Sequence, residues 1–311
     1  MSHYRRFPLE NFQKLTRGNR STWFLVPIPK DAVQTALKQA FPLQKLSLLP
    51  LPTDNKALFP NGFPTGMHPV LANVGVQSDI QMSALQIDGG LKGASVYATY
   101  ISREGKPTPL AASLSSYIAG EHGPLPDGLV PAVASPLLFA GTPIRLGEFD
   151  PDADAYMLDG GGALSTQSRW AIVPNPISGP GVYSKAVDFL FRFQQGAKKY
   201  SELLFKTLIN QPIILPSGKC QRNQYYFANA SAEQQFVAGQ VRLGPGASGY
   251  GVLKGALMEA SPGGDGVYED QEGFRGKVLL RLRSDFARWS ASLLTAVFLF
   301  SRLCTECWQQ S

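Results

Sequence analysis

The sequence predicts a mostly β-structured protein with a few helices, an α+β fold. The chain has 311 residues, among them 31 glycines and 24 prolines, which divide it into many short segments and argue against a helix bundle. Several segments, such as "GASVYATYIS", are rich in the β-branched and aromatic residues that favour strands. Hydrophobic residues make up 44% and charged residues 17%, which is typical of a globular chain with a sizeable core.

The first half of the chain begins with a predicted strand over residues 22–26 and a turn bounded by prolines. A short helix follows, with Asp31 as its N-cap and apolar positions at helical spacing. After a proline-rich loop, a strand is expected around residues 70–76. "SDIQMSALQI" then alternates apolar and polar residues, so one of its faces should be wet or line a cavity. "GASVYATYIS" is a further strand, and "REGKP" is the turn after it.

The second half begins with short apolar pieces separated by glycine and proline. "YMLDGGGALSTQSRWAIVPNP" is expected to form a strand, a turn and a strand. Residues 183–212 look the most helical, with one or two amphipathic helices that end at Pro212. Strands are then expected in "QPIILP", "NQYYFAN", "QQFVAGQVRLGP" and "YGVLKGALMEA", with "GPGASGYG" as a hairpin turn.

The C-terminal segment differs from the rest of the chain, so we expect a single domain over residues 1–272 and a basic, apolar helical extension over 273–311. "ASLLTAVFLFSRL" is too short to span a bilayer. Such a helix can dock on the domain, on a membrane surface or on a second copy of the chain, which would give a homo-oligomer. Much of the net charge of +6 lies in this extension, so the basic balance does not indicate a nucleic-acid groove.

The remaining composition points to a cytoplasmic protein without a disulfide framework. The basic N-terminus has no apolar stretch after it, so no signal peptide is expected. Three cysteines, Cys220, Cys304 and Cys307, form an odd set with two near the end of the chain.

Motifs for cofactors and metals are missing from the sequence, so we expect neither. There is no Walker A motif, and "GPGASGYG" lacks the strand-to-helix context of a dinucleotide fingerprint. His3, His68 and His122 are scattered, which disfavours a zinc site and a histidine-dependent triad. The acidic stretch 148–159 lacks the glycine and the terminal glutamate of a calcium loop.

The lysines in apolar segments are the chemical equipment that remains. A lysine in an apolar pocket can act as a Schiff-base nucleophile. Lys185 in "GVYSKAVDFLF", Lys92 in "GGLKGASVY" and Lys206 in "LLFKTLI" are the candidates. Each can also be an ordinary surface lysine whose stem lies along apolar neighbours.

"GKCQRNQYYFANAS" places polar residues at the start of an aromatic strand. Arg222 can grip a carboxylate with two hydrogen bonds, or it can pair with an acidic side chain of the protein. Gln221, Asn223 and Tyr225 would then bind substrate beside it. His68 in "GMHPV" can hydrogen-bond a substrate or stabilise its own loop, and Cys220 lacks a partner histidine that would make it a nucleophile.

Two of these segments, "FLVPIPKDAVQTAL" and "CQRNQYYFANASAEQQFVAGQVRLG", resemble acetoacetate decarboxylase-like proteins, and the chain is similar to their fungal branch near secondary-metabolite genes. The resemblance covers residues 23–262. It implies a mostly antiparallel fold, a closed barrel or double sheet around a deep apolar cavity with a few peripheral helices.

The resemblance also implies a lysine Schiff base with an arginine and a glutamate in the same pocket. Lys185 in "VYSKAV" is the nearest counterpart of the family's "Y-P-K-K" lysine, although the second lysine is missing. Arg222 corresponds to the arginine after the family's cysteine with one inserted residue, and Glu104 is the nearest glutamate by order.

The implied function is an enzyme of secondary metabolism that acts on an apolar carbonyl compound of polyketide or terpenoid origin. It would be a lysine-dependent decarboxylase or lyase. A cofactor-free cyclase, pericyclase or isomerase that works by holding a reactive conformer is an alternative. A non-catalytic carrier with the same cavity is another.

Overall fold

A computed structural model describes residues 13–82, 85–87, 90–120, 144–152, 154–170, 186–227, 234–245, 247–248, 251–252 and 255–284. Five strands carry much of the structure: β1 (Gln13–Pro29), β3 (Met67–Met82), β5 (Leu91–Arg103), β6 (Leu110–Ala119) and β16 (Val267–Ser284). Strands of middle length are β7 (Ile144–Asp150), β9 (Leu164–Trp170), β10 (Val187–Phe193), β12 (Cys220–Phe227) and β13 (Gln235–Leu243).

Shorter strands and three helices complete the described elements. The short strands are β2 (Leu46–Leu48), β4 (Leu85–Ile87), β8 (Met157–Leu158), β11 (Ile213–Ile214), β14 (Ala247–Ser248) and β15 (Gly251–Val252). The helices are α1 (Lys30–Ala40), α3 (Glu202–Ile209) and α4 (Ala256–Glu259). β14 and β15 pair as a hairpin, which confirms the turn predicted in "GPGASGYG".

The main sheet is mostly antiparallel, with β6 pairing in parallel with β7 and with β11. Hydrogen-bonded neighbours lead from β6 through β7, β9, β10, β13, β16, β1, β3 and β5 back to β6. β12 joins β16 and β11 beside this path. The predicted α+β class with a mostly antiparallel sheet is confirmed. A closed barrel around a deep apolar cavity stays a prediction.

The sheet separates two hydrophobic cores because successive residues of a strand face opposite sides. On β1, Phe24 and Val26 face the first core, while Trp23 and Leu25 face the second. The first core includes Val70, Val74, Ala94, Tyr117, Phe189, Phe191 and Val241. The second core includes Leu71, Tyr200, Leu204, Phe205, Leu208, Phe236 and Phe274.

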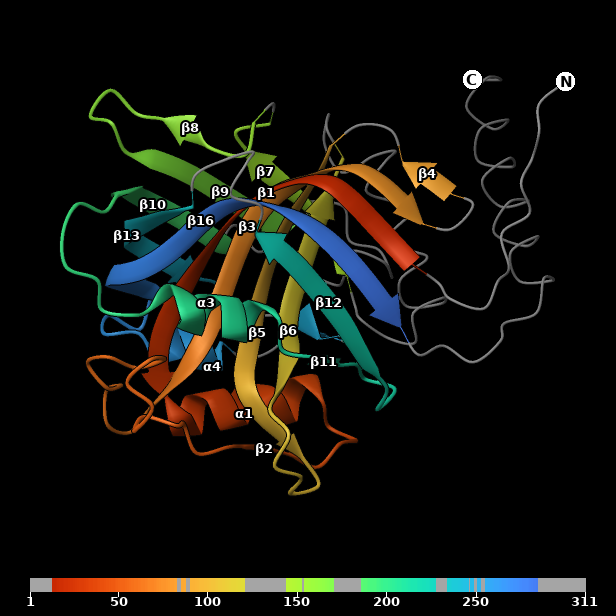
Figure 1. Ribbon diagram of the computed structural model, residues 1–311, viewed down its shortest axis with the longest axis vertical. Helices are drawn as coiled ribbons and strands as arrows, with labels where there is room; N and C mark the ends of the chain where they lie inside the picture. Colours follow the sequence, from red (N-terminus) through yellow and green to blue (C-terminus); the bar gives the residue numbers. More distant parts are fainter. Residues whose placement is uncertain are drawn as a thin grey trace, which may run out of the picture.

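Helix α1 covers the first core at one end of β3, β5 and β6, and β8 lies toward the opposite end (Figure 1). It buries Val33, Ala36 and Leu37. The predicted cap by Asp31 is wrong: Pro29 occupies the N-cap position without a side-chain hydrogen bond, and Asp31 lies in the first turn. An acidic residue there still complements the partial positive charge of the helix N-terminus.

Helix α3 covers the second core and crosses in front of β3 and β5 (Figure 1). Its N-cap is Ser201, whose hydroxyl accepts a hydrogen bond from the Leu204 N–H at 3.0 Å. Among the described residues, no helix is both long enough and apolar enough to cross a bilayer.

Two segments differ from the secondary structure that the sequence predicts. Residues 187–193, predicted as helix, form β10, in which Val187, Phe189 and Phe191 alternate toward the first core. The end of "YGVLKGALMEA", predicted as strand, forms α4.

The predicted C-terminal extension is described only at its start. Residues 273–284 belong to β16, which runs without interruption from Val267. Residues 285–311 lie outside the described part of the chain, so the two-part organisation stays a prediction.

Candidate functional site

A lysine is buried on the face of β5 that borders the first core. Lys92, Ala94 and Val96 share this face by strand alternation, and Ala94 and Val96 belong to the first core. Lys92 is 3% exposed. Val96, four residues further along β5, lies beside Ala36 of α1. Lys92 therefore lies at the end of the first core that is farther from α1. Charged side chains are rarely buried without a paired group, so a partner for the ammonium group of Lys92 is expected nearby.

The ammonium group of Lys92 is held by the loop that follows β7. Its Nζ donates to the Pro151 carbonyl oxygen at 3.3 Å and to Asp152 Oδ1 at 3.1 Å. The Lys92 side chain is 4% exposed, but that of Asp152 is 65% exposed. The cation therefore belongs to the fixed strand, whereas its carboxylate reaches in from a solvent-facing loop.

A second cation, Arg145, is buried on the same side of the sheet. Arg145 is 3% exposed and lies opposite Tyr117 in the parallel pairing of β6 and β7. Tyr117 is in turn opposite Ala94 of β5, so Arg145 and Lys92 border the same end of the first core. Burial lowers the pKa of Arg145, and the neighbouring Tyr117 raises it. Arginine nevertheless remains a cation in proteins.

Two small residues lie close to these cations in the strand register. Ala119 is the cross-strand partner of Lys92 on β6, and Gly147 follows Arg145 by two residues on β7. A Cβ atom at Gly147 would lie 3.1 Å from Tyr117 Cβ and 3.2 Å from Phe149 Cε2. Glycine at this position therefore lets Tyr117 pack closely against β7.

Tyr156 fixes the other end of the loop that reaches Lys92. Its hydroxyl donates to the Val74 carbonyl oxygen at 2.9 Å, and its ring contacts Phe191 edge-on at 5.3 Å between centroids. The guanidinium of Arg275 lies 5.1 Å from the centre of the same ring. We define the site cluster as Lys92, Arg145, Asp152, Tyr156 and Arg275. Three of its members are cations, and Asp152 is its carboxylate.

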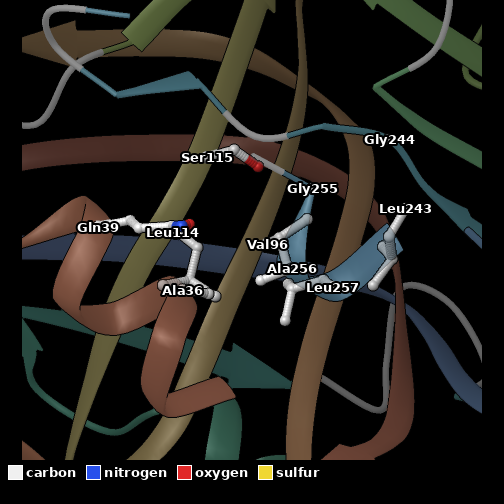
Figure 2. Close-up of a pocket in the computed structure, with 10 residues that line it drawn as sticks. All are labelled: Ala36, Gln39, Val96, Leu114, Ser115, Leu243, Gly244, Gly255, Ala256 and Leu257. Carbon is white, nitrogen blue, oxygen red and sulfur yellow. The ribbon is translucent and has the colours of Figure 1, made fainter. Parts of the chain in front are cut away.

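A hollow lies at the opposite end of the first core, between α1 and α4 (Figure 2). The enclosed part of this hollow is about 20 Å³, and its walls include Ala36, Val96, Leu114 and Leu257. Val96 is four residues from Lys92, a separation of roughly 13 Å along a strand. Gln39 Oε1 is buried there and has no hydrogen-bond partner within the described part of the chain. The hollow is thus a mostly apolar space, with the polar side chains of Gln39 and Ser115 in its wall, and it is separate from the site cluster.

The predicted catalytic residues are not brought into the site cluster. Lys185 lies outside the described residues. Arg222 is exposed on β12, opposite Arg283 of β16, and Glu104 is exposed in the turn after β5. A buried glutamate, Glu272 (2% exposed), accepts hydrogen bonds from the backbone N–H groups of Lys199 and Tyr200, so its oxygens stabilise the segment before α3.

The predicted substrate-binding residues lie on both sides of the sheet. Tyr225 packs edge-on against Trp23 of the second core, with ring centroids 5.7 Å apart. His68 is fully buried on the face of β3 that carries Val70 of the first core. Gln221 is half-buried opposite Ile213, and the side chain of Asn223 is outside the described part of the structure. Among described residues, no group of three or more His, Cys, Asp or Glu side chains could hold a metal ion.

No family model and no curated protein matches the chain. Several solved structures do match. One is an acetoacetate decarboxylase from Legionella pneumophila, with a TM-score of 0.46 and 9% identity over 91% of this chain and 92% of that one. A second acetoacetate decarboxylase has a TM-score of 0.44 and 11% identity over 90% and 91% of the two chains. The enduracididine biosynthesis enzyme MppR has a TM-score of 0.44 and 10% identity over 89% of each.

Two of these neighbours are named as acetoacetate decarboxylases, and the third as an enzyme of enduracididine biosynthesis. Their scores are too low to assign this chain a family or an activity. Any function therefore has to be argued from the residues of this chain.

Lys92 was one of three lysines that the sequence singled out, and its burial separates it from Lys206. Lys206 is 32% exposed and pairs with Glu202 one helical turn away, as expected for a surface lysine. Arg145, Asp152 and Tyr156 were missed. The available signal was the position of Lys92 at alternate spacing with Ala94 and Val96, which places a charge on an apolar strand face.

Proposed function

We propose that this protein is a lysine-dependent decarboxylase or lyase that acts on an apolar carbonyl compound, with Lys92 as the Schiff-base nucleophile. One observation carries the proposal: Lys92 is buried beside the first core and has a loop carboxylate, Asp152, as its ion-pair partner. Lysines in apolar surroundings are the ones that proteins use as amine nucleophiles. The sequence resemblance supports a metabolite of polyketide or terpenoid origin as substrate.

The chemistry follows from the groups of the site cluster. The amine of Lys92 attacks the carbonyl carbon, and loss of water leaves an iminium ion. When the bond to the carboxylate carbon breaks, its electron pair moves into the iminium, which gives an enamine and carbon dioxide. Protonation of the enamine carbon and hydrolysis then release the product and the free lysine.

Two other members of the site cluster have proposed roles in these steps. Asp152, whose Oδ1 is 3.1 Å from Lys92 Nζ, exchanges the proton that the amine loses before attack. The guanidinium of Arg145 holds the substrate carboxylate before the bond breaks, because arginine pairs well with carboxylates.

Borohydride trapping tests the proposal. The full chain is incubated with acetoacetate and sodium borohydride, and the reduced adduct is located by peptide mass analysis. We expect the adduct on Lys92 and its loss in Lys92→Met, which keeps an unbranched side chain at the position. Lys206→Met is the matched control, since Lys206 is partly exposed and lies on α3.

Lys185 provides the discriminating comparison. We expect Lys185→Met to form the Lys92 adduct as the unaltered chain does. An adduct on Lys185 alone would overturn the assignment of Lys92 and restore the lysine that the sequence favoured. Labelling that is absent, or spread evenly over surface lysines, would exclude Schiff-base chemistry and favour the cyclase or carrier alternatives.

A further inference from the structure

The chain after β7 is fastened to neighbouring strands at two points, one at Pro151 and Asp152 and the other at Tyr156. At its beginning, the Pro151 carbonyl oxygen and the Asp152 carboxylate accept hydrogen bonds from Lys92 of β5. At its end, the Tyr156 hydroxyl donates to Val74 of β3. Val74 pairs with Ala94, which is two residues from Lys92, so both fastening points lie on neighbouring strands at the same end of the first core.

The fastening at Tyr156 is supported by the packing of its ring. Burial raises the pKa of Tyr156 to about 12, so its hydroxyl keeps its proton and remains a donor at neutral pH. Phe191 and Arg275 contact the ring from β10 and β16. The side chain of Asp152, in contrast, is 65% exposed.

We infer that Tyr156 is a positioning residue: by anchoring the segment 151–156 to Val74, it holds the Asp152 carboxylate beside the amine of Lys92. Release of this anchor would let the segment move away and expose the amine. The catalytic meaning of this contact rests on the proposed function, but the contact itself concerns only the accessibility of Lys92. Tyr156 thereby sets how often the nucleophile is covered by its own carboxylate.

The test measures how fast Lys92 reacts with a neutral acetylating reagent in the full native chain, relative to exposed Lys45. Tyr156→Phe removes the hydroxyl and keeps the ring. We expect the ratio of the Lys92 rate to the Lys45 rate to rise about tenfold, the change that loss of one ordinary hydrogen bond would give. Asp152→Asn should raise the same ratio.

Tyr268→Phe is a matched control. Tyr268 is 5% exposed, and its hydroxyl also donates to a backbone carbonyl oxygen, that of Leu257 in α4. Tyr268→Phe also removes a tyrosine hydroxyl, but at the other end of the first core, where the segment 151–156 has no described contact. We expect the Lys92 ratio to stay unchanged in this variant.

A double-mutant cycle separates positioning from general loosening. If Tyr156 acts through Asp152, then Tyr156→Phe should change the ratio little when Asp152→Asn is already present. An equal rise in Tyr156→Phe and Tyr268→Phe, no rise in Tyr156→Phe, or full additivity with Asp152→Asn would each overturn the inference. Because the labelling needs no ketone, its outcome is independent of the adduct that tests the proposed function.

Discussion

His68 shows, at the scale of a single residue, how burial alone can fix the charge of a side chain. Its Nε2 lies 2.6 Å from the Thr99 carbonyl oxygen, so this nitrogen carries the proton in the neutral ring. Burial lowers the pKa of His68 to about 4, while the Thr99 carbonyl opposes the shift and Lys30 adds to it. A histidine in this setting is a neutral part of the core, which favours the stabilising reading of "GMHPV" over substrate binding.

The depressed pKa of His68 predicts a loss of stability in mild acid. The unfolded chain takes up this proton near pH 6.5, but the folded chain does so only near pH 4. Between pH 7 and pH 5, we therefore expect His68 to lower the free energy of unfolding by about 2 kcal/mol. The measurement is urea unfolding at both pH values, for the unaltered chain and for His68→Gln.

The comparison with His68→Gln isolates this one histidine, because His3 and His122 are present in both proteins. The glutamine amide can still donate to Thr99 but does not titrate. If both proteins lose the same stability on acidification, His68 is not the group that takes up the proton.

Single residues also mark the limit of what could be predicted for the site. The sequence identified Lys92 as a candidate because its neighbours are glycine, alanine and apolar residues. Its burial could not be deduced, since a surface lysine with a packed stem has the same local sequence. Arg145 and Asp152 were missed because their roles depend on the pairing of β7 with β6 and on the path of the loop after β7.

At the scale of elements, the backbones of β10 and β13 approach closely at Gly239. Gly239 is opposite Phe191, and the pairing of β13 with β16 shifts register between Gly239 and Val241. A Cβ atom at Gly239 would lie 2.6 Å from Phe191 Cα and would also meet the Leu190 carbonyl oxygen. Backbone atoms cannot move aside as a flexible side chain can, so this contact requires glycine.

Gly239→Ala should accordingly destabilise the protein. We expect the free energy of unfolding to fall by at least about 2 kcal/mol, because β10 and β13 must separate to admit the methyl group. Gly160→Ala is the control, since a Cβ atom at Gly160 has nothing within 4 Å. Equal stability of the two variants in urea would show that the strands can adjust at no cost.

Elements with a strict alternation or a strong turn signal were predicted well. β5, β12 and β13 lie where the sequence places strands, as does the hairpin of β14 and β15. Residues 187–193 were mistaken for a helix because five of seven are apolar and no glycine or proline interrupts them. Their partners on β9 and β13 decide between helix and strand, and sequence periodicity does not identify partners.

At the scale of the whole molecule, the same strands form a wall of both cores. Phe189 packs edge-on against Phe24 in the first core, with centroids 4.8 Å apart. Phe205 stacks on Phe274 in the second, at 5.6 Å. Phe24 is followed on β1 by Leu25 of the second core, so neither core can lose its packing without disturbing a strand of the other. That the two cores share strands could not be predicted from the sequence, because the sequence did not decide between a closed barrel and a double sheet.

A shared wall predicts cooperative unfolding. We expect Phe189→Ala and Phe205→Ala each to lower the free energy of unfolding by about 3–5 kcal/mol. Each variant should still unfold in one transition, with coincident far-UV and near-UV circular dichroism curves. Two separate transitions in either variant would mean that the cores are independent folding units.

The alternating faces of β3 have a consequence for how this chain can change over time. His68, Val70, Ala72 and Val74 face one core, and Leu71 faces the other. A one-residue insertion or deletion within β3 would send every later side chain to the wrong side, and with it the pairing that places Val74 under Tyr156. Substitutions can accumulate in this strand, but length changes should be confined to loops without such contacts, such as the turn after β5 that carries the exposed Glu104.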